Sequence, residues 1–195
     1  TGRPPSALLG HSFGGKVVLE ALEEGEGPDT RGRGDGTRQA WIVDSTPSAR
    51  EPGGSAVRML RAVRSLPERF SSREEAVGGL EEQGFARPVA RWMTTNLERG
   101  DGGFRWSLDW SAMEALLEDF FRKDLWPVLE EPPDGWEVHV VKAEDSAVLP
   151  EEACDRIRDA GRRTGRVFLH RLSGGHWLNA DNPDGVVDLL AEELP

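Results

Sequence analysis

The chain has 195 residues, with 24 basic and 35 acidic side chains and a net charge of −11, and this length is enough for one domain with a substantial core. The acidic balance argues against nucleic acid or an anionic membrane surface as a general partner and is compatible with an enzyme acting on neutral substrates. No apolar run approaches the roughly 18 residues that a membrane span needs, and the single cysteine, Cys154, excludes an internal disulfide and favours a reducing compartment.

The first predicted elements are a short buried strand over Ser6–Leu9 and a helix over Phe13–Glu24. The apolar side chains that can share one face of this helix are Val17, Val18, Ala21 and Leu22. Gly25–Arg38 is almost free of apolar residues, which predicts a surface loop inserted between elements. Gln39–Val43 is a second apolar strand, which ends at Asp44.

From Gly53 to Trp126 the sequence shows no strand pattern. Apolar spacing instead predicts four helices: one marked by Val57, Leu60 and Arg64, and others over Arg73–Gln83, Pro88–Leu97 and Ser111–Lys123. Four tryptophans lie in or beside this block, and we expect them to be core residues: Trp92, Trp106, Trp110 and Trp126. A helical block between two strands is typical of a lid over a site.

The remaining chain alternates again between helix and strand. In order, we expect a Pro-rich connection over Pro127–Asp134, a strand over Trp136–Ala143, a charged helix over Pro150–Thr164, a strand over Arg166–Leu172 and a helix over Val186–Leu194 opened by Asn182-Pro183-Asp184. Cys154 is expected to be a small apolar side chain on the charged helix. This alternation predicts a parallel sheet with helices on both faces.

The most informative motif is Gly10-x-Ser12-x-Gly14, between the first strand and the first helix. It is the nucleophile-elbow pattern, in which a serine on a sharp strand-to-helix turn has strained backbone angles and an exposed hydroxyl. Small residues two positions before and after the serine let the strand and the helix approach each other. The serine then lies near the positive end of the helix.

The same stretch also fits a phosphate-binding loop. Gly10-x-x-x-x-Gly15-Lys16 matches the first seven positions of a P-loop, and Ala40–Asp44 resembles the strand that ends in a magnesium-binding aspartate. The eighth position should be Ser or Thr to hold the metal, and it is Val17 here. The elbow is therefore favoured, and a P-loop nucleotide hydrolase is the less favoured alternative.

Polar residues follow the predicted strands at their carboxyl ends, where sites form in parallel sheets. They are Ser12, Asp44, Glu144-Asp145-Ser146 and His176, the last on a Gly-Gly loop. Acyl transfer by serine needs a base for the hydroxyl proton and an acid that orients the base. His176 is the candidate base, whereas His11 is expected to support the turn by packing, and His139 and His170 lie within strands, facing core or solvent.

Three segments together carry a resemblance to a known family: Gly10–Val17, Val43–Pro47 and Gly175–Pro183. They resemble the α/β-hydrolase-fold esterases of the YbfF and abhydrolase-domain-11 type, including plant members, over nearly the whole chain. The resemblance implies an α/β-hydrolase fold with a helical lid. Residues 1–52 would form the elbow strand, the helix and the next strand of the core, 53–126 the lid, and 127–195 the rest of the core.

The identity of the acid is open between two aspartates. Many α/β-hydrolases place it after the strand that follows the lid, in a pattern like Gly-x-x-Asp-x-x-x-Pro. That position here is Ser146, one residue beyond Asp145. The esterases that the chain resembles place the acid after the strand that follows the elbow helix. We therefore predict Asp44 as the acid and keep Asp145 as the alternative.

One donor of the oxyanion hole is expected to be the backbone N–H of Phe13, the residue after the nucleophile. The second donor normally comes from a loop after an earlier strand, often carrying His-Gly. The resemblance implies further strands ahead of the elbow. We therefore expect this sequence, which begins at Thr1 without methionine, to be the C-terminal part of a longer protein with its N-terminal strands missing. The loss of one such donor typically costs ~10²–10³ in rate.

These inferences predict a serine hydrolase acting on carboxylic esters. Ser12 attacks the carbonyl, His176 takes its proton, Asp44 orients the imidazolium and the Phe13 N–H receives the oxyanion. No cofactor and no metal is required, and the partner is a small-molecule ester or acyl substrate. The alternative is a catalytically incompetent fragment or binding module of the same fold. An intracellular location is favoured, in the cytoplasm or an organelle such as a plastid or mitochondrion.

Overall fold

The computed structural model describes residues 6–25 and 38–194. The predicted loop Gly25–Arg38 lies, apart from its two end residues, outside the described residues. The chain divides into two compact units, Thr1–Ala49 with Lys123–Pro195 and Arg50–Arg122. The second unit covers most of the segment for which the sequence predicted a lid over residues 53–126.

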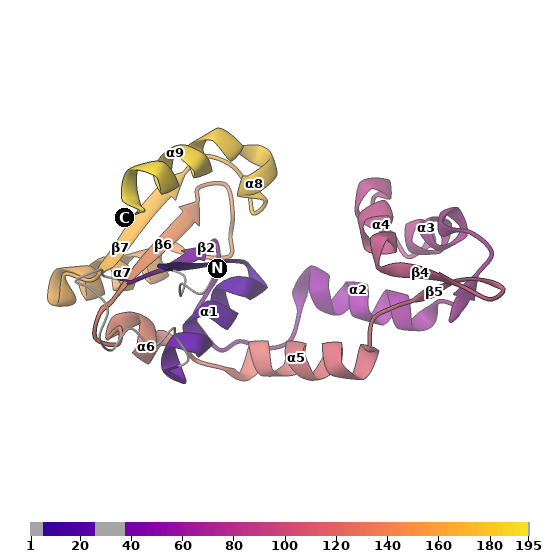
Figure 1. Cartoon of the computed structure of the whole chain (residues 1–195), viewed down its shortest axis with the longest axis horizontal. Helices are drawn as coiled ribbons and strands as arrows, with labels where there is room; N and C mark the ends of the chain where they lie inside the picture. The colour runs from indigo at the N-terminus through magenta and orange to yellow at the C-terminus, as the bar shows by residue number, and fades with distance from the viewer. Residues whose placement is uncertain (1–5, 26–37, 195) are drawn as a thin grey trace. The chain divides into compact units, whose positions relative to one another are not determined.

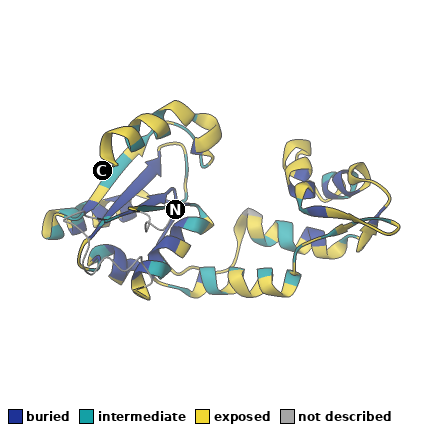
Figure 2. Cartoon of the chain, viewed as in Figure 1, coloured by how far each residue is buried: buried dark blue, intermediate teal, exposed yellow. Residues whose placement is uncertain are grey.

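The first unit is built on a four-stranded parallel sheet in the order β1 (Ala7–His11), β2 (Arg38–Val43), β6 (Trp136–Ala143) and β7 (Val167–Leu172) (Figure 1). The predicted parallel sheet with flanking helices is confirmed. The central strands β2 and β6 are buried almost throughout, whereas the outer strands β1 and β7 are partly exposed (Figure 2).

Strand β1 differs from the buried strand that its apolar sequence predicted. Only Gly10 is buried in it, and Leu9 is 51% exposed. The reason lies in its position, because within the described residues β1 pairs with β2 alone and forms one edge of the sheet. Within the described residues, the strand that leads into the elbow therefore lies at an open edge of the sheet.

In the described part of the first unit, five helices flank this sheet: α1 (Phe13–Glu23), α6 (Trp126–Glu130), α7 (Glu151–Thr164), α8 (Leu178–Asp181) and α9 (Pro183–Glu193). Alternation along β2 divides the core between the two faces of the sheet. Ala40 and Ile42 pack in a cluster with residues of α1, α6 and α7. Trp41 and Val43 pack in another cluster with residues of α8 and α9.

Three details of these helices differ from the sequence-based expectations. The buried face of α1 includes Leu19, whereas Val17 is 53% exposed. The predicted Pro-rich connection contains most of the helix α6. Pro127 lies in the first turn of this helix, where a residue without an N–H costs no hydrogen bond. The short helix α8 was not predicted.

Cys154 is fully buried on α7, as expected for a small apolar side chain, and burial raises the pKa of its thiol.

The second unit contains strands, so the prediction of a purely helical block is wrong. Its helices are α2 (Gly54–Ser65), α3 (Arg73–Glu82), α4 (Arg87–Met93), the 3₁₀ turn η1 (Thr94–Asn96) and α5 (Trp110–Arg122). Its strands form an antiparallel sheet in the order β3 (Arg69–Phe70), β5 (Gly103–Trp106) and β4 (Leu97–Gly100). They are two to four residues long, too short for an alternating pattern to stand out.

The four tryptophans expected in the core of this block differ in unit and in burial. Trp106 and Trp110 pack against the buried cluster of the second unit, with ring centroids 5.6 Å apart. Trp126 is buried in the first unit, and Trp92 is 58% exposed, contrary to the expectation. None of the helices in the described ranges is long and apolar enough to cross a membrane.

Candidate active site

Ser12 occupies a strained turn between β1 and α1. Its backbone has φ 56° and ψ −117°, and a positive φ is uncommon for any residue other than glycine. The Ser12 N–H donates to the Val43 carbonyl at 2.9 Å, and the Ser12 carbonyl accepts from Gly15 N–H at 3.0 Å. These bonds hold the strained turn against the end of β2, so the serine has the conformation of a nucleophile elbow.

Two glycines make this turn possible. A Cβ on Gly10 would lie 2.0 Å from the Gly14 carbonyl oxygen, and a Cβ on Gly15 would lie 2.5 Å from the Cβ of Ser45. Nothing lies within 4 Å of a Cβ built on Gly14. The close approach predicted for both motif glycines is therefore seen at Gly10, and the following glycine, Gly15, has the second tight contact.

Asp44 follows β2 directly and is completely buried. Its φ is 42°, the other positive value of a non-glycine residue among the described ones. The Asp44 N–H donates to the Val141 carbonyl at 2.8 Å, and Ala143 N–H donates to Oδ1 at 3.2 Å. One carboxylate oxygen is thus held by the backbone of β6, and the other oxygen is directed to a different partner.

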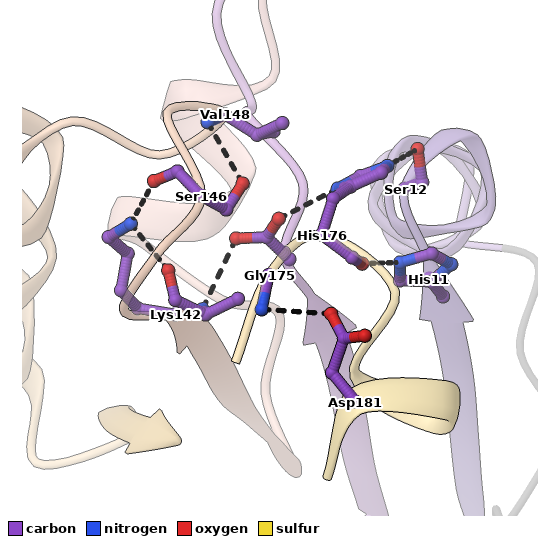
Figure 3. A network of polar contacts seen from close by, with 10 residues as sticks. His11, Ser12, Lys142, Ser146, Val148, Gly175, His176 and Asp181 are labelled. Atoms are coloured by element: carbon purple, nitrogen blue, oxygen red, sulfur yellow. Dashed lines mark hydrogen bonds and ion pairs between the residues drawn. The ribbon is translucent and has the colours of Figure 1, made fainter. Parts of the chain in front are cut away.

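That partner is His176, on the loop after β7. Its Nδ1–H donates to Asp44 Oδ2 at 2.7 Å, and its Nε2 accepts from Ser12 Oγ at 2.9 Å (Figure 3). Three residues from three different strand ends, 132 and 164 positions apart from His176 in sequence, therefore form one hydrogen-bonded chain. This arrangement can move a proton from the serine hydroxyl to the imidazole while the carboxylate fixes the tautomer.

The alternative acid, Asp145, lies elsewhere. Its side chain is exposed, and within the described residues no hydrogen bond or ion pair of its carboxylate is recorded. Its backbone N–H instead donates to the Gly174 carbonyl at 3.0 Å. On the other side of the same loop, Gly175 N–H donates to Asp181 Oδ2 at 2.9 Å (Figure 3). Asp145 thus supports the His176 loop through its main chain.

The family of the chain follows from its sequence as a whole. The model of the alpha/beta hydrolase family matches residues 1–189. The chain belongs to this family. No significant match to this chain is found among the curated proteins.

Several solved structures are similar to this chain in fold. A marine microorganism esterase aligns with a TM-score of 0.73 at 19% identity, over 95% of this chain and 69% of its own. E-2-(Acetamidomethylene)succinate hydrolase aligns with a TM-score of 0.64 at 20% identity, over 97% and 66%. An esterase of M. tuberculosis aligns with a TM-score of 0.56 at 16% identity, over 96% and 61%. The chain thus spans about two thirds of the length of these structures.

Lys16, the residue that suggested a P-loop, has a structural position in the first unit. It is 4% exposed, and its ammonium donates to the carbonyls of Ser48 at 2.9 Å and Lys123 at 2.8 Å. These contacts anchor α1 to both segments of the first unit that adjoin the second unit. The P-loop interpretation is therefore wrong, in agreement with the family.

A second buried lysine, Lys142, escaped the sequence analysis. It is 4% exposed at the end of β6 and donates to the carbonyl of Ala143 at 2.6 Å and to that of Ser146. The Ser146 hydroxyl, at the position of the more common acid, accepts from Val148 N–H at 3.2 Å (Figure 3). Lys142 thus stabilises the turn after β6. The same turn provides the Ala143 N–H that donates to Asp44 and the Asp145 N–H that donates to the Gly174 carbonyl. A lysine between Val141 and Ala143 in a predicted strand was the signal that could have revealed it.

Two further histidines form a stack in the sheet of the first unit. His139 is 2% exposed, its ring stacks on Trp41 at 4.3 Å between centroids, and its Nδ1 lies 3.0 Å from His170 Nε2. Burial, together with the neighbouring His170, lowers the pKa of His139 to about 4, and burial also lowers the pKa of His170. Both imidazoles are therefore neutral at pH 7.

Phe13, whose N–H was predicted to receive an oxyanion, is the first residue of α1. The N–H groups of the first helical turn have no acceptor within the helix, and the helix dipole adds positive potential there. Phe13 therefore has the backbone position from which an elbow serves an oxyanion.

Proposed function

We propose that the chain is a serine hydrolase that cleaves carboxylic esters through an acyl-enzyme, with Ser12, His176 and Asp44 as its triad. The observation that carries this proposal is the continuous chain of bonds from Ser12 Oγ to His176 Nε2, 2.9 Å, and from His176 Nδ1 to Asp44 Oδ2, 2.7 Å. The strained backbone of Ser12 supports it, because such strain is characteristic of an exposed nucleophile.

The reaction would proceed in two halves. Ser12 Oγ bonds to the ester carbonyl carbon while its proton passes to His176 Nε2, and the carbonyl π electrons move to the oxygen. Asp44 stabilises the imidazolium, which then protonates the departing alkoxide and leaves an acyl-serine. Water attacks this ester with His176 again as the base, and the carboxylic acid leaves as Ser12 regains its proton.

The developing oxyanion would be stabilised by the N–H of Phe13 at the start of α1. A second donor would come from a loop after an earlier strand. This donor belongs to the proposal for the whole protein and is not among the described residues. Removing one such donor costs ~10²–10³ in kcat. The same proposal extends to the substrate side, where Arg50–Arg122 would act as the lid that selects the acyl or alcohol group.

The choice of an ester rests on two supports. Two of the similar structures are described as esterases, and the three motif segments resemble the esterases of the YbfF and abhydrolase-domain-11 type. Asp44 as the acid is consistent with that type, because Asp44 follows the strand after the elbow helix.

Active-site labelling tests this proposal directly. A fluorophosphonate probe should label the wild-type chain at Ser12, since it reacts with an activated serine, and should leave Ser12→Ala unlabelled. Hydrolysis of a short aryl ester should be lost in the same variant. A folded wild-type chain that neither takes up the probe nor hydrolyses the ester would instead support the alternative of a binding module with the same fold.

A further inference from the structure

His11, the residue before the proposed nucleophile, contacts the proposed base. Its Nε2–H donates to the main-chain carbonyl of His176 at 2.6 Å (Figure 3). The neighbouring Ser12 contacts the side chain of the same residue, through the 2.9 Å bond to Nε2. Two consecutive residues of the elbow therefore hold His176, one by its backbone and one by its ring.

The loop that carries His176 depends on such contacts. It follows Gly174 and Gly175, and Gly174 has a φ of +126°, a conformation open to glycine and rarely adopted by other residues. Three hydrogen bonds hold the loop just before His176: from Asp145 N–H to the Gly174 carbonyl, from Gly175 N–H to Asp181, and from the Asn182 amide to the Ser173 carbonyl. Within the described residues, the bond from His11 is the one that acts on the backbone of His176 itself.

The rings add a second contact between the same residues. The centroids of His11 and His176 lie 4.8 Å apart, and that of His11 lies 5.4 Å from Trp177. Ring pairs of this kind add a favourable contact between the elbow and the His176 loop. The hydrogen bond and the ring contact can be separated experimentally, because glutamine keeps an N–H donor without a ring and phenylalanine keeps a ring without a donor.

We propose that His11 is a positioning residue for the base: its Nε2–H fixes the main chain of His176 relative to the elbow and so keeps Nε2 within reach of Ser12 Oγ. The inference rests on the proposed function and adds a residue to it. The bond requires the tautomer of His11 with a proton on Nε2, and a carbonyl oxygen is its acceptor. His11 therefore acts through His176 and takes no proton from Ser12.

The size of the effect follows from the geometry of proton transfer. A displacement of about 1 Å in a reacting group can cost ~10² in rate. We expect His11→Phe to lower kcat for a short aryl ester by ~10- to 100-fold with little change in KM, because the loop loses its tie while the substrate contacts stay. His11→Gln should recover most of the wild-type kcat.

A spectroscopic readout tests the same inference without any turnover. The proton between His176 Nδ1 and Asp44 should give a far-downfield ¹H NMR signal, identified by its loss in Asp44→Asn. The signal should persist in wild type and His11→Gln and broaden or vanish in His11→Phe. Thermal unfolding of each variant identifies a general loss of structure, for which the glutamine variant is the matched control.

The outcomes separate the two proposals. Equal kcat and equal NMR signals in wild type and His11→Phe would overturn the positioning role. A loss in His11→Gln as large as that in His11→Phe would also overturn it, since an N–H donor at this position would then not be enough to hold His176 in place. If the wild-type chain hydrolyses no ester, the proposed function fails, yet the NMR comparison still decides whether the His11 hydrogen bond orders His176.

Discussion

At the residue scale, Gly10 is the position where the elbow tolerates least change. A methyl group there would lie 2.0 Å from the carbonyl oxygen of Gly14, a backbone atom that cannot move without α1. We expect Gly10→Ala to lower the free energy of unfolding by about 3 kcal/mol, the upper end of the usual cost of overpacking. Urea denaturation measures this loss, and fluorophosphonate labelling of Ser12 should fall in parallel.

Gly14→Ala is the matched control for that change. A Cβ on Gly14 meets nothing within 4 Å, and Gly14 lies inside α1. Because alanine is favoured over glycine by up to ~1 kcal/mol within a helix, this variant should be as stable as the wild type or more so. A Gly14→Ala variant less stable than Gly10→Ala would contradict the account of the elbow.

A second prediction at this scale compares the two candidate acids, Asp44 and Asp145. Asp44 is completely buried and bonded to His176, so Asp44→Asn should lower kcat by ~10⁴, as loss of the orienting acid does in serine hydrolases. Asp145→Asn keeps the backbone N–H that contacts Gly174 and should change kcat little. Initial rates on a short aryl ester compare the two, and a larger loss in Asp145→Asn would reverse the assignment.

At the element scale, the turn after β6 depends on Lys142. The ammonium donates to two carbonyls of the turn, those of Ala143 and Ser146. Charged hydrogen bonds of this kind contribute about 1.5–3 kcal/mol each. Lys142→Met should therefore lower the free energy of unfolding by about 3 kcal/mol in urea denaturation. Arg158→Met, which removes an exposed ion pair with Asp155, should change the free energy of unfolding by less than about 1 kcal/mol. An equal loss of stability in both variants would contradict the stabilising role of the Lys142 hydrogen bonds.

The histidine stack between β6 and β7 makes stability depend on pH. The pKa of His139 is lowered from 6.5 to about 4, mainly by burial and then by His170, while Glu193 acts in the opposite direction and Glu137 lies 3.7 Å from Nε2. The unfolded chain then binds more protons than the folded chain between these two pH values. Stability is complete above about pH 6.5 and falls as the pH decreases towards 4.

The size and the test of this pH effect follow from the same shift. A change from 6.5 to about 4 corresponds to at most about 3 kcal/mol of lost stability. His139→Phe keeps a ring against Trp41 and removes the titrating group, so its unfolding free energy should vary less between pH 7 and pH 4.5. Equal pH dependence in wild type and His139→Phe would assign the effect to other groups.

The elements show which parts of the fold the sequence could predict. Strands β2 and β6 were predicted almost to the residue, because β-branched residues and tryptophan are concentrated in both and turn-forming residues bound them. The short strands of the second unit were missed, since segments of two to four residues carry no periodic signal. Local pattern also placed Ser12, Asp44 and His176 at strand ends, which topology then brought together.

The contacts made by His11 and Lys142 lay beyond such reasoning for a physical reason. His11 bonds to a carbonyl 165 positions away, and the partners of Lys142 are carbonyls that every residue possesses. A side chain that recognises backbone leaves no complementary side chain in the sequence. Gly15 was equally hidden, because its need for a small residue comes from the side chain of Ser45, in the segment after β2.

At the scale of the whole molecule, the two units have separate cores and are joined by two adjoining segments of chain. Within the first unit, Leu125 N–H donates to the Pro47 carbonyl at 2.9 Å, so the outgoing and returning segments lie side by side where the second unit begins and ends. Within the second unit, Arg50 N–H donates to the Phe121 carbonyl at 2.8 Å. A short Gly-Ser linker between Ala49 and Lys123 should therefore close the first unit without strain.

We expect the chain with this linker in place of Arg50–Arg122 to unfold cooperatively and to keep labelling of Ser12, because the bonds among Ser12, His176 and Asp44 lie entirely within the first unit. If the removed unit is the lid, the variant should hydrolyse short aryl esters at a rate near that of the full chain. Its kcat/KM should vary less along a series of acyl chain lengths, since the lid selects among them. Unchanged selectivity along the series would contradict the lid, and loss of cooperative unfolding would contradict the independence of the two cores.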